Sequence, residues 1–193
     1  MKRTILVSTF ILLCLASIHG QHSQAAIADN PESGTWINVA PANAGFTILM
    51  PAQPREGANP LKDGLDQHFI TLETKLAAYV VSYIDFPEAV TDPAAIKDML
   101  DRGRDGAVAT MKAELTSERE IKIKQFVGRE WLMKLPKGLI ATARTYWVRH
   151  RLYQTVFVTT PAADDSSEVM KLRQEVANRF LNSFSLSGDN VAK

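Results

Sequence analysis

Four β-type segments follow one another in the second half of the chain, and the links between them are very short. We predict them as strands over residues 116–124, 129–135, 139–148 and 151–160. Parallel strands need a crossover of a dozen or more residues, whereas antiparallel strands join through tight turns. The four segments therefore indicate an antiparallel sheet, and this sheet is the main constraint on the fold.

The last two of these segments are joined by Arg149 and His150. The favoured two-residue hairpin needs a positive φ at both central residues, and Asn-Gly supplies it best. Arginine is strained in that conformation, and histidine tolerates it better than most residues. We therefore expect a connection slightly longer than two residues.

Further β-type segments precede the first helix. They are predicted over residues 35–39, 45–50, 65–74 and 78–85. Residues 51–64 carry Pro54, Gly57 and Pro60, and these residue types punctuate strands, so this stretch is expected to be a loop.

The first helix is expected to start near Thr91-Asp92-Pro93. Thr91 or Asp92 can cap free backbone N–H groups, and Pro93 suits the first helical turn. Apolar residues then follow helical spacing as far as Met111. Gly103 and Gly106 interrupt this helix, and they either pack closely against the sheet or kink the helix.

A second helix is predicted to begin at Asp165, which would be its N-cap. Its buried face is expected to carry Val169, Leu172, Val176 and Phe180. A short strand over 183–186 and a tail over 188–193 complete the chain. The predicted fold class is α+β, a single domain over 35–187 whose mostly antiparallel sheet is flanked by two principal helices.

The N-terminus has the pattern of a secretory signal peptide. Lys2 and Arg3 precede a nearly unbroken apolar run, residues 5–18, whereas a helix that spans a membrane needs about 20 such residues. Small residues place the cleavage site after residue 25, or as late as residue 28. We therefore predict a signal peptide over 1–25, a flexible lead-in over 29–34, and a periplasmic or secreted protein.

Two alternatives for the N-terminus remain open, an uncleaved anchor and a lipid anchor on Cys14. Lipid attachment prefers a small residue before the cysteine, and Leu13 stands there, so a lipid anchor is disfavoured. Cys14 is the only cysteine of the chain, which excludes a disulfide scaffold and any multi-cysteine metal site.

The residue patterns that usually carry catalysis or cofactor binding are weak in this sequence. His68 and His150 lie far apart, and no other metal ligands stand at a near spacing. Ser82, Asp85 and His68 are a conceivable triad, but alternation along a strand puts Ser82 and Asp85 on opposite faces. Residues 103–106 lack the lysine and serine or threonine of a phosphate-binding loop. We therefore predict no catalytic, cofactor-binding or metal-binding residue.

Arginine and aromatic residues gather on the last strands, and both types are enriched at protein interfaces. The candidate partner-binding residues are Trp131, Trp147, Arg149, His150, Arg151 and Tyr153. Ordinary sheet packing is the alternative interpretation. Nucleic-acid binding is disfavoured because the 22 basic and 21 acidic side chains almost balance.

Several stretches together resemble an uncharacterised bacterial family of exported domains. These stretches are Gly45–Pro54, Tyr79–Pro87, Arg104–Gly106, Gly128–Glu130, Arg151–Gln154 and Phe180–Phe184. The family's expected fold is similar to that of PsbP, the extrinsic subunit of photosystem II, in which an antiparallel sheet lies between helices. Such sequences often have an asparagine-containing turn where this chain has Arg149-His150.

The resemblance implies a non-catalytic module that docks onto larger proteins or membrane assemblies, and it supplies no catalytic residue. The expected function is therefore an exported binding or assembly-accessory protein whose partner is an envelope protein or assembly. The alternative is a small-ligand-binding protein or weak hydrolase that uses carboxylates and His68 or His150.

Overall fold

The computed structural model describes residue 32 and residues 34–61, 64–159 and 166–187. Our predictions for the signal peptide, for Cys14 and for the C-terminal tail concern residues outside these ranges. Within them, no helix is long and apolar enough to cross a membrane.

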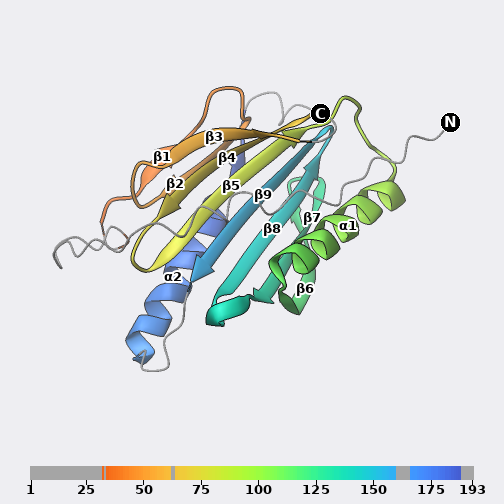
Figure 1. Ribbon diagram of the computed structural model, residues 1–193. Coiled ribbons are helices and arrows are strands. Elements are labelled where there is room, and N and C mark those ends of the chain that lie inside the picture. The colour runs from red at the N-terminus through yellow and green to blue at the C-terminus, as the bar shows by residue number, and fades with distance from the viewer. Residues whose placement is uncertain (1–31, 33, 62–63, 160–165, 188–193) are drawn as a thin grey trace.

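A seven-stranded antiparallel sheet forms the centre of the molecule (Figure 1). Its strands are ordered β3-β4-β5-β9-β8-β7-β6, so the four consecutive strands of the second half form one side of the sheet. The bounds are β3 (Arg55–Pro60), β4 (Asp66–Glu73), β5 (Ala77–Asp85), β6 (Glu114–Ile123), β7 (Phe126–Lys134), β8 (Ile140–Val148) and β9 (Arg151–Thr159). A 3-10 turn, η2 (Pro136–Gly138), joins β7 to β8.

A second, three-stranded sheet holds the two ends of the described chain together. It consists of β1 (Ile37–Val39), β2 (Phe46–Met50) and β10 (Ser185–Leu186), with β2 in the middle. All its pairs are antiparallel. It packs against the large sheet through Phe46, which contacts Tyr83 and Tyr153 edge-on.

Helix α1 (Pro93–Met111) covers one face of the large sheet. Asp92 is its N-cap, with the carboxylate accepting a hydrogen bond from the N–H of Ala95. The helix runs unbroken through both glycines, and a Cβ at Gly103 would meet no atom within 4 Å. Close packing therefore does not explain Gly103.

Helix α2 (Ser167–Ser183) covers the opposite face. Its N-cap is Ser166, whose hydroxyl accepts from the N–H of Val169, so the cap lies one residue later than the predicted Asp165. Its buried residues are Val176, Ala177, Phe180 and Leu181, while Val169 and Leu172 are half-buried.

The two faces of the sheet carry separate cores, because neighbouring residues of one strand belong to different clusters. Tyr79 and Val81 of β5 lie in the core beside α2, and Ala78 and Val80 lie in the core beside α1. Figure 1 shows the resulting layers, with α1 in front of the sheet and α2 behind it. The predicted α+β class, an antiparallel sheet flanked by two helices, is confirmed.

Two local predictions are wrong. Residues 55–60 form strand β3 instead of a loop. Gly57 permits this pairing, since a Cβ there would lie 2.5 Å from the Phe69 ring. The β8–β9 connection is also not lengthened, because Val148 pairs directly with Arg151 and Arg149 accepts a φ of 60°.

The lead-in over residues 29–34, predicted to be flexible, differs from that prediction at residue 32. Glu32 is buried, and its carboxylate accepts hydrogen bonds from the hydroxyls of Thr74 and Tyr79. Its backbone oxygen accepts from the Trp36 indole at 3.1 Å. Residue 32 is therefore anchored to the β4–β5 turn. The neighbouring residues 29–31 and 33 lie outside the described ranges.

Candidate functional site

Three of the six candidate partner-binding residues are buried. Trp131, Trp147 and Tyr153 are 0%, 1% and 0% exposed. Trp131 belongs to the core beside α1, and Tyr153 belongs to the core beside α2. Trp147 packs with Ile84 and Phe86 in a smaller cluster. These three side chains hold the sheet to its helices and do not form a surface that a partner could touch.

The other three candidates lie at the β8–β9 hairpin, where Arg149 and His150 form the two-residue tip. The segment that follows β5 fixes both residues of the tip. The Phe86 N–H donates to the His150 carbonyl at 2.7 Å, and the Val90 N–H donates to the Arg149 carbonyl at 3.1 Å. Two backbone hydrogen bonds therefore fix the hairpin tip, in which His150 is exposed and Arg149 is half-buried.

Arg151 begins β9 and ties three parts of the molecule together. Its Nε and Nη2 donate to the two carboxylate oxygens of Asp85 on β5, at 2.5 and 2.7 Å. Its Nη1 donates to the carbonyls of Ala44, at 2.7 Å, and of Asn43, at 3.0 Å. The β1–β2 loop is thereby fastened to the end of the large sheet.

This loop is one wall of a cleft of about 370 Å³, which we call the His68 cleft. Residues 41–43 of the loop lie on one side. The other principal lining residues come from β3, β4, β5 and β9 and are Glu56, His68, Ile70, Tyr83, Asp85 and Arg151. A volume of this size falls in the range of small-molecule sites.

Aromatic rings form the floor of the His68 cleft. His68 stacks on Tyr83 with 4.7 Å between ring centroids, as their direct pairing in the β4–β5 register allows. The Arg151 guanidinium lies 4.7 Å from the centre of the same Tyr83 ring. Burial raises the pKa of Tyr83, and Asp85 and Glu56 raise it further against the opposing effect of Arg151. The phenol therefore stays protonated at neutral pH.

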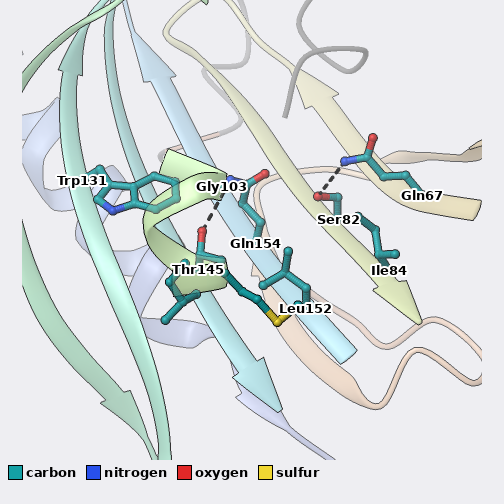
Figure 2. A pocket seen from close by; sticks show the side chains of 10 residues that line it. Gln67, Ser82, Ile84, Gly103, Trp131, Thr145, Leu152 and Gln154 are labelled. Atoms are coloured by element: carbon teal, nitrogen blue, oxygen red, sulfur yellow. Dashed lines mark hydrogen bonds between the residues drawn. The ribbon is translucent and has the colours of Figure 1, made fainter. Parts of the chain in front are cut away.

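A second, smaller cavity of about 20 Å³ lies on the other face of the sheet, beneath α1 (Figure 2). Its polar lining comes from adjacent strands. Gln67 Nε2 lies 3.4 Å from Ser82 Oγ, and Gln154 Nε2 lies 3.5 Å from Thr145 Oγ1. Such a volume holds about one water molecule and no larger ligand.

This arrangement separates the conceivable triad. Ser82 lines the cavity beneath α1, whereas His68 and Asp85 line the cleft on the opposite face. His150 approaches Asp85, with 3.8 Å between Nε2 and Oδ1. Among the described residues, neither histidine is hydrogen-bonded to a hydroxyl that it could activate as a nucleophile.

Sequence reasoning did not find the His68 cleft. Glu56 lay in a predicted loop, and His68 and Asp85 were considered together only as part of a triad with Ser82, without Tyr83 or Arg151. The register pairs His68 with Tyr83 and Asp85 with Arg151. The order of the hairpins could have suggested these pairs only if the position of β9 beside β5 had been known, and the sequence does not show that position.

No family model and no curated protein matches the chain. Several solved structures are similar to it, among them the following two. The solution structure of PsbP (CyanoP) from the cyanobacterium Synechocystis sp. PCC 6803 has a TM-score of 0.51 and 17% identity. This match covers 87% of the present chain and 98% of the cyanobacterial one.

The second structure is the protein of unknown function PA94 from Pseudomonas aeruginosa. It has a TM-score of 0.40 and 17% identity, and the match covers 66% of the present chain and 85% of PA94. The likeness to CyanoP defines the fold class of this chain, an α+β protein with a PsbP-like fold. At 17% sequence identity, the structural likeness indicates a shared fold, and it does not assign a function.

Proposed function

We propose that the chain is an exported, non-catalytic binding or assembly-accessory protein of the bacterial envelope, and that it contacts its partner with the β8–β9 hairpin tip. The signal-peptide pattern of residues 1–25 supports export.

The observation that carries the proposal is the strained and rigid hairpin tip. Arg149 has a φ of 60°, a conformation that glycine or asparagine adopts at lower cost. Its carbonyl and that of His150 are both fixed by hydrogen bonds. The tip is therefore held in one conformation, with His150 exposed and Arg149 half-buried, and it offers these two side chains to a contact outside the chain.

The proposal is tested by crosslinking the tagged protein in envelopes of its own source cells. A double variant, Arg149→Ser with His150→Ser, is compared with the wild type. The control, Lys171→Ser with Glu175→Ser, removes an exposed ion pair on α2. The proposal is supported if a stoichiometric partner is recovered with the wild type and the control but is lost with the hairpin variant. Equal recovery with all three proteins would remove the hairpin from the proposal.

Small-ligand binding is the second candidate function, and the His68 cleft is the observation that favours it. The cleft has the volume of a small-molecule site and combines aromatic, carboxylate and imidazole groups. A survey of ligands by thermal shift, with the wild type and a Tyr83→Phe variant, would test it. Stabilisation by a ligand in both proteins, weaker in the variant, would place the ligand in the cleft.

A further inference from the structure

The positive charge of the His68 cleft is already engaged within the protein. Arg151 Nε and Nη2 bind both oxygens of Asp85. Arg151 Nη1 donates to two backbone carbonyls of the β1–β2 loop and to the Tyr153 hydroxyl. An anionic ligand would have to compete for these N–H groups and would loosen the loop, so the arrangement does not favour anions.

The hydrogen-bonding capacity that remains in the cleft consists mainly of acceptors. Glu56 is exposed, lines the cleft, and forms no ion pair with the described residues. Tyr83 lines the same cleft. Asp85 is 43% exposed at its side chain, and a carboxylate has about four lone-pair sites, of which Arg151 uses two. Two carboxylates against one guanidinium leave an excess of negative charge.

His68 and Tyr83 add a surface suited to the stem of a basic side chain. In the strand register, these stacked rings lie between Glu56 on β3 and Asp85 at the end of β5. The methylene groups of a lysine or arginine pack on such a surface while the charged end reaches a carboxylate. The Arg151 guanidinium over Tyr83 shows that this ring already accepts one planar cation.

The spacing of the two carboxylates distinguishes an organic cation from a metal ion. Glu56 is opposite Ile70, and Ile70 is opposite Val81, which lies four residues before Asp85 on β5. Four strand residues span about 13 Å along the sheet, and Glu56 also lies two strands, about 10 Å, across it from Asp85, which is further than the two side chains can close. A metal ion binds oxygen ligands at about 2–2.6 Å, so one ion cannot join the two carboxylates, whereas an extended basic chain can lie between them.

We propose that the His68 cleft binds a basic group, a guanidinium or a primary ammonium, carried by an extended ligand. This inference deepens the proposed binding function and rests on it, because it names the chemistry that the binding protein selects. Glu56 receives the charged end, and the His68–Tyr83 floor receives the aliphatic stem. Asp85 is the second acceptor and stays paired with Arg151.

The direct test is calorimetric titration of the purified protein with agmatine, which carries a guanidinium and a primary ammonium on a four-carbon chain. Glutarate, a dicarboxylate of similar length, is the anionic counterpart. We expect agmatine to bind and glutarate not to bind. Equal or tighter binding of glutarate would overturn the proposal, and so would an absence of agmatine binding at millimolar concentration.

Variants place the ligand in the cleft. Glu56→Gln is expected to weaken agmatine binding about tenfold, because it removes a charge-assisted hydrogen bond. The matched control is Glu114→Gln, since Glu114 is also an exposed glutamate on an edge strand but lies on β6 at the other end of the sheet. Equal affinity of the two variants would contradict the assignment. Both positions are exposed, so thermal unfolding should show both variants to be folded.

A second arm identifies the source of the basic group. The blocked peptide acetyl-Gly-Arg-Gly-amide carries the guanidinium on a protein-like backbone. If it binds at least as tightly as agmatine and depends on Glu56, the cleft receives an arginine of a protein partner. If agmatine binds and the peptide does not, the ligand is a free amine or guanidine. Partner capture that depends on Arg149, without binding of either cation, would leave the proposed function standing and refute this inference alone.

Discussion

Arg151 and Asp85 form a two-point ion pair across β9 and β5, with 2.7 Å between Nη2 and Oδ2. The same guanidinium binds the Ala44 carbonyl at 2.7 Å, so a single side chain joins the two sheets beside the hairpin tip. We expect Arg151→Ala to destabilise the protein by about 2 kcal/mol, because it leaves several acceptors without a donor. Urea unfolding measures this change.

The comparison for Arg151→Ala is Arg119→Ala. Arg119 also binds a carboxylate, that of Glu130 at 2.6 Å, but its side chain is 65% exposed. Exposed ion pairs contribute about 0–1 kcal/mol, so this variant should unfold almost like the wild type. If Arg151→Ala lowers the free energy of unfolding as little as Arg119→Ala does, the β1–β2 loop does not depend on Arg151.

Gly103 is a position where the protein can be stabilised. A Cβ there meets no atom within 4 Å, and the residue lines the cavity of Figure 2. Gly103→Ala should raise the free energy of unfolding by about 1 kcal/mol, because alanine favours the helix by that amount. Thermal and urea unfolding would show the gain.

Gly128→Ala is the contrasting glycine substitution. A Cβ at Gly128 would lie 2.4 Å from the carbonyl oxygen of Thr145 and 2.5 Å from the Tyr146 ring. β7 is paired on both sides, so its backbone cannot move aside cheaply, and this variant should be destabilised by at least about 1 kcal/mol. A stable Gly128→Ala protein would mean that β7 and β8 pack less closely than described.

Acid should weaken the protein in part through Glu130. Burial alone would raise its pKa, but hydrogen bonds from Arg119 and Arg144 outweigh burial and lower the pKa below the ordinary value of 4.5. The stabilisation that Glu130 contributes is therefore complete above pH 4.5 and is lost as the pH falls through the lowered value.

Glu130→Gln tests this acid dependence. The variant should be less stable than the wild type near pH 6, and the difference should shrink as the pH falls toward 3. Urea unfolding at a series of pH values measures both curves, with Glu175→Gln on exposed α2 as the control. A difference that stays constant with pH would show that ionisation of Glu130 is not responsible.

The sequence predicted the sheet and helices well where strong local patterns exist. The four strands between residues 114 and 159 and both helices have clear periodicity or caps. Strand β3 was missed because Pro54, Gly57 and Pro60 are loop signals. At a sheet edge, however, such residues are tolerated, and Gly57 makes room for Phe69. Local composition therefore could not reveal a strand whose pairing depends on β4.

The site was less predictable because burial and register are tertiary properties. Trp131, Trp147 and Tyr153 are residue types that are common at interfaces, yet alternation along their strands turns the side chains inward, into the two main cores and the smaller cluster around Trp147. His68 and Arg151 are far apart in the chain, and they line one cleft only because β9 pairs with β5 rather than lying at the sheet edge. No local pattern specifies that insertion.

At the hairpin tip, a single substitution should change the stability of the protein and its partner binding in opposite directions. Arg149→Gly should stabilise the protein by about 0.5–1 kcal/mol, because glycine adopts the positive φ of this position without strain. The same change removes the arginine that we assign to the partner contact. The variant should therefore be more stable and yet bind less partner.

Crosslinked capture from source-cell envelopes with Arg149→Gly, alongside its melting temperature, is the decisive test of the hairpin contact. We expect a melting temperature at or above that of the wild type and a loss of most of the recovered partner. Undiminished capture by a folded Arg149→Gly protein would contradict it and show that the strained arginine at the hairpin tip does not contact the partner.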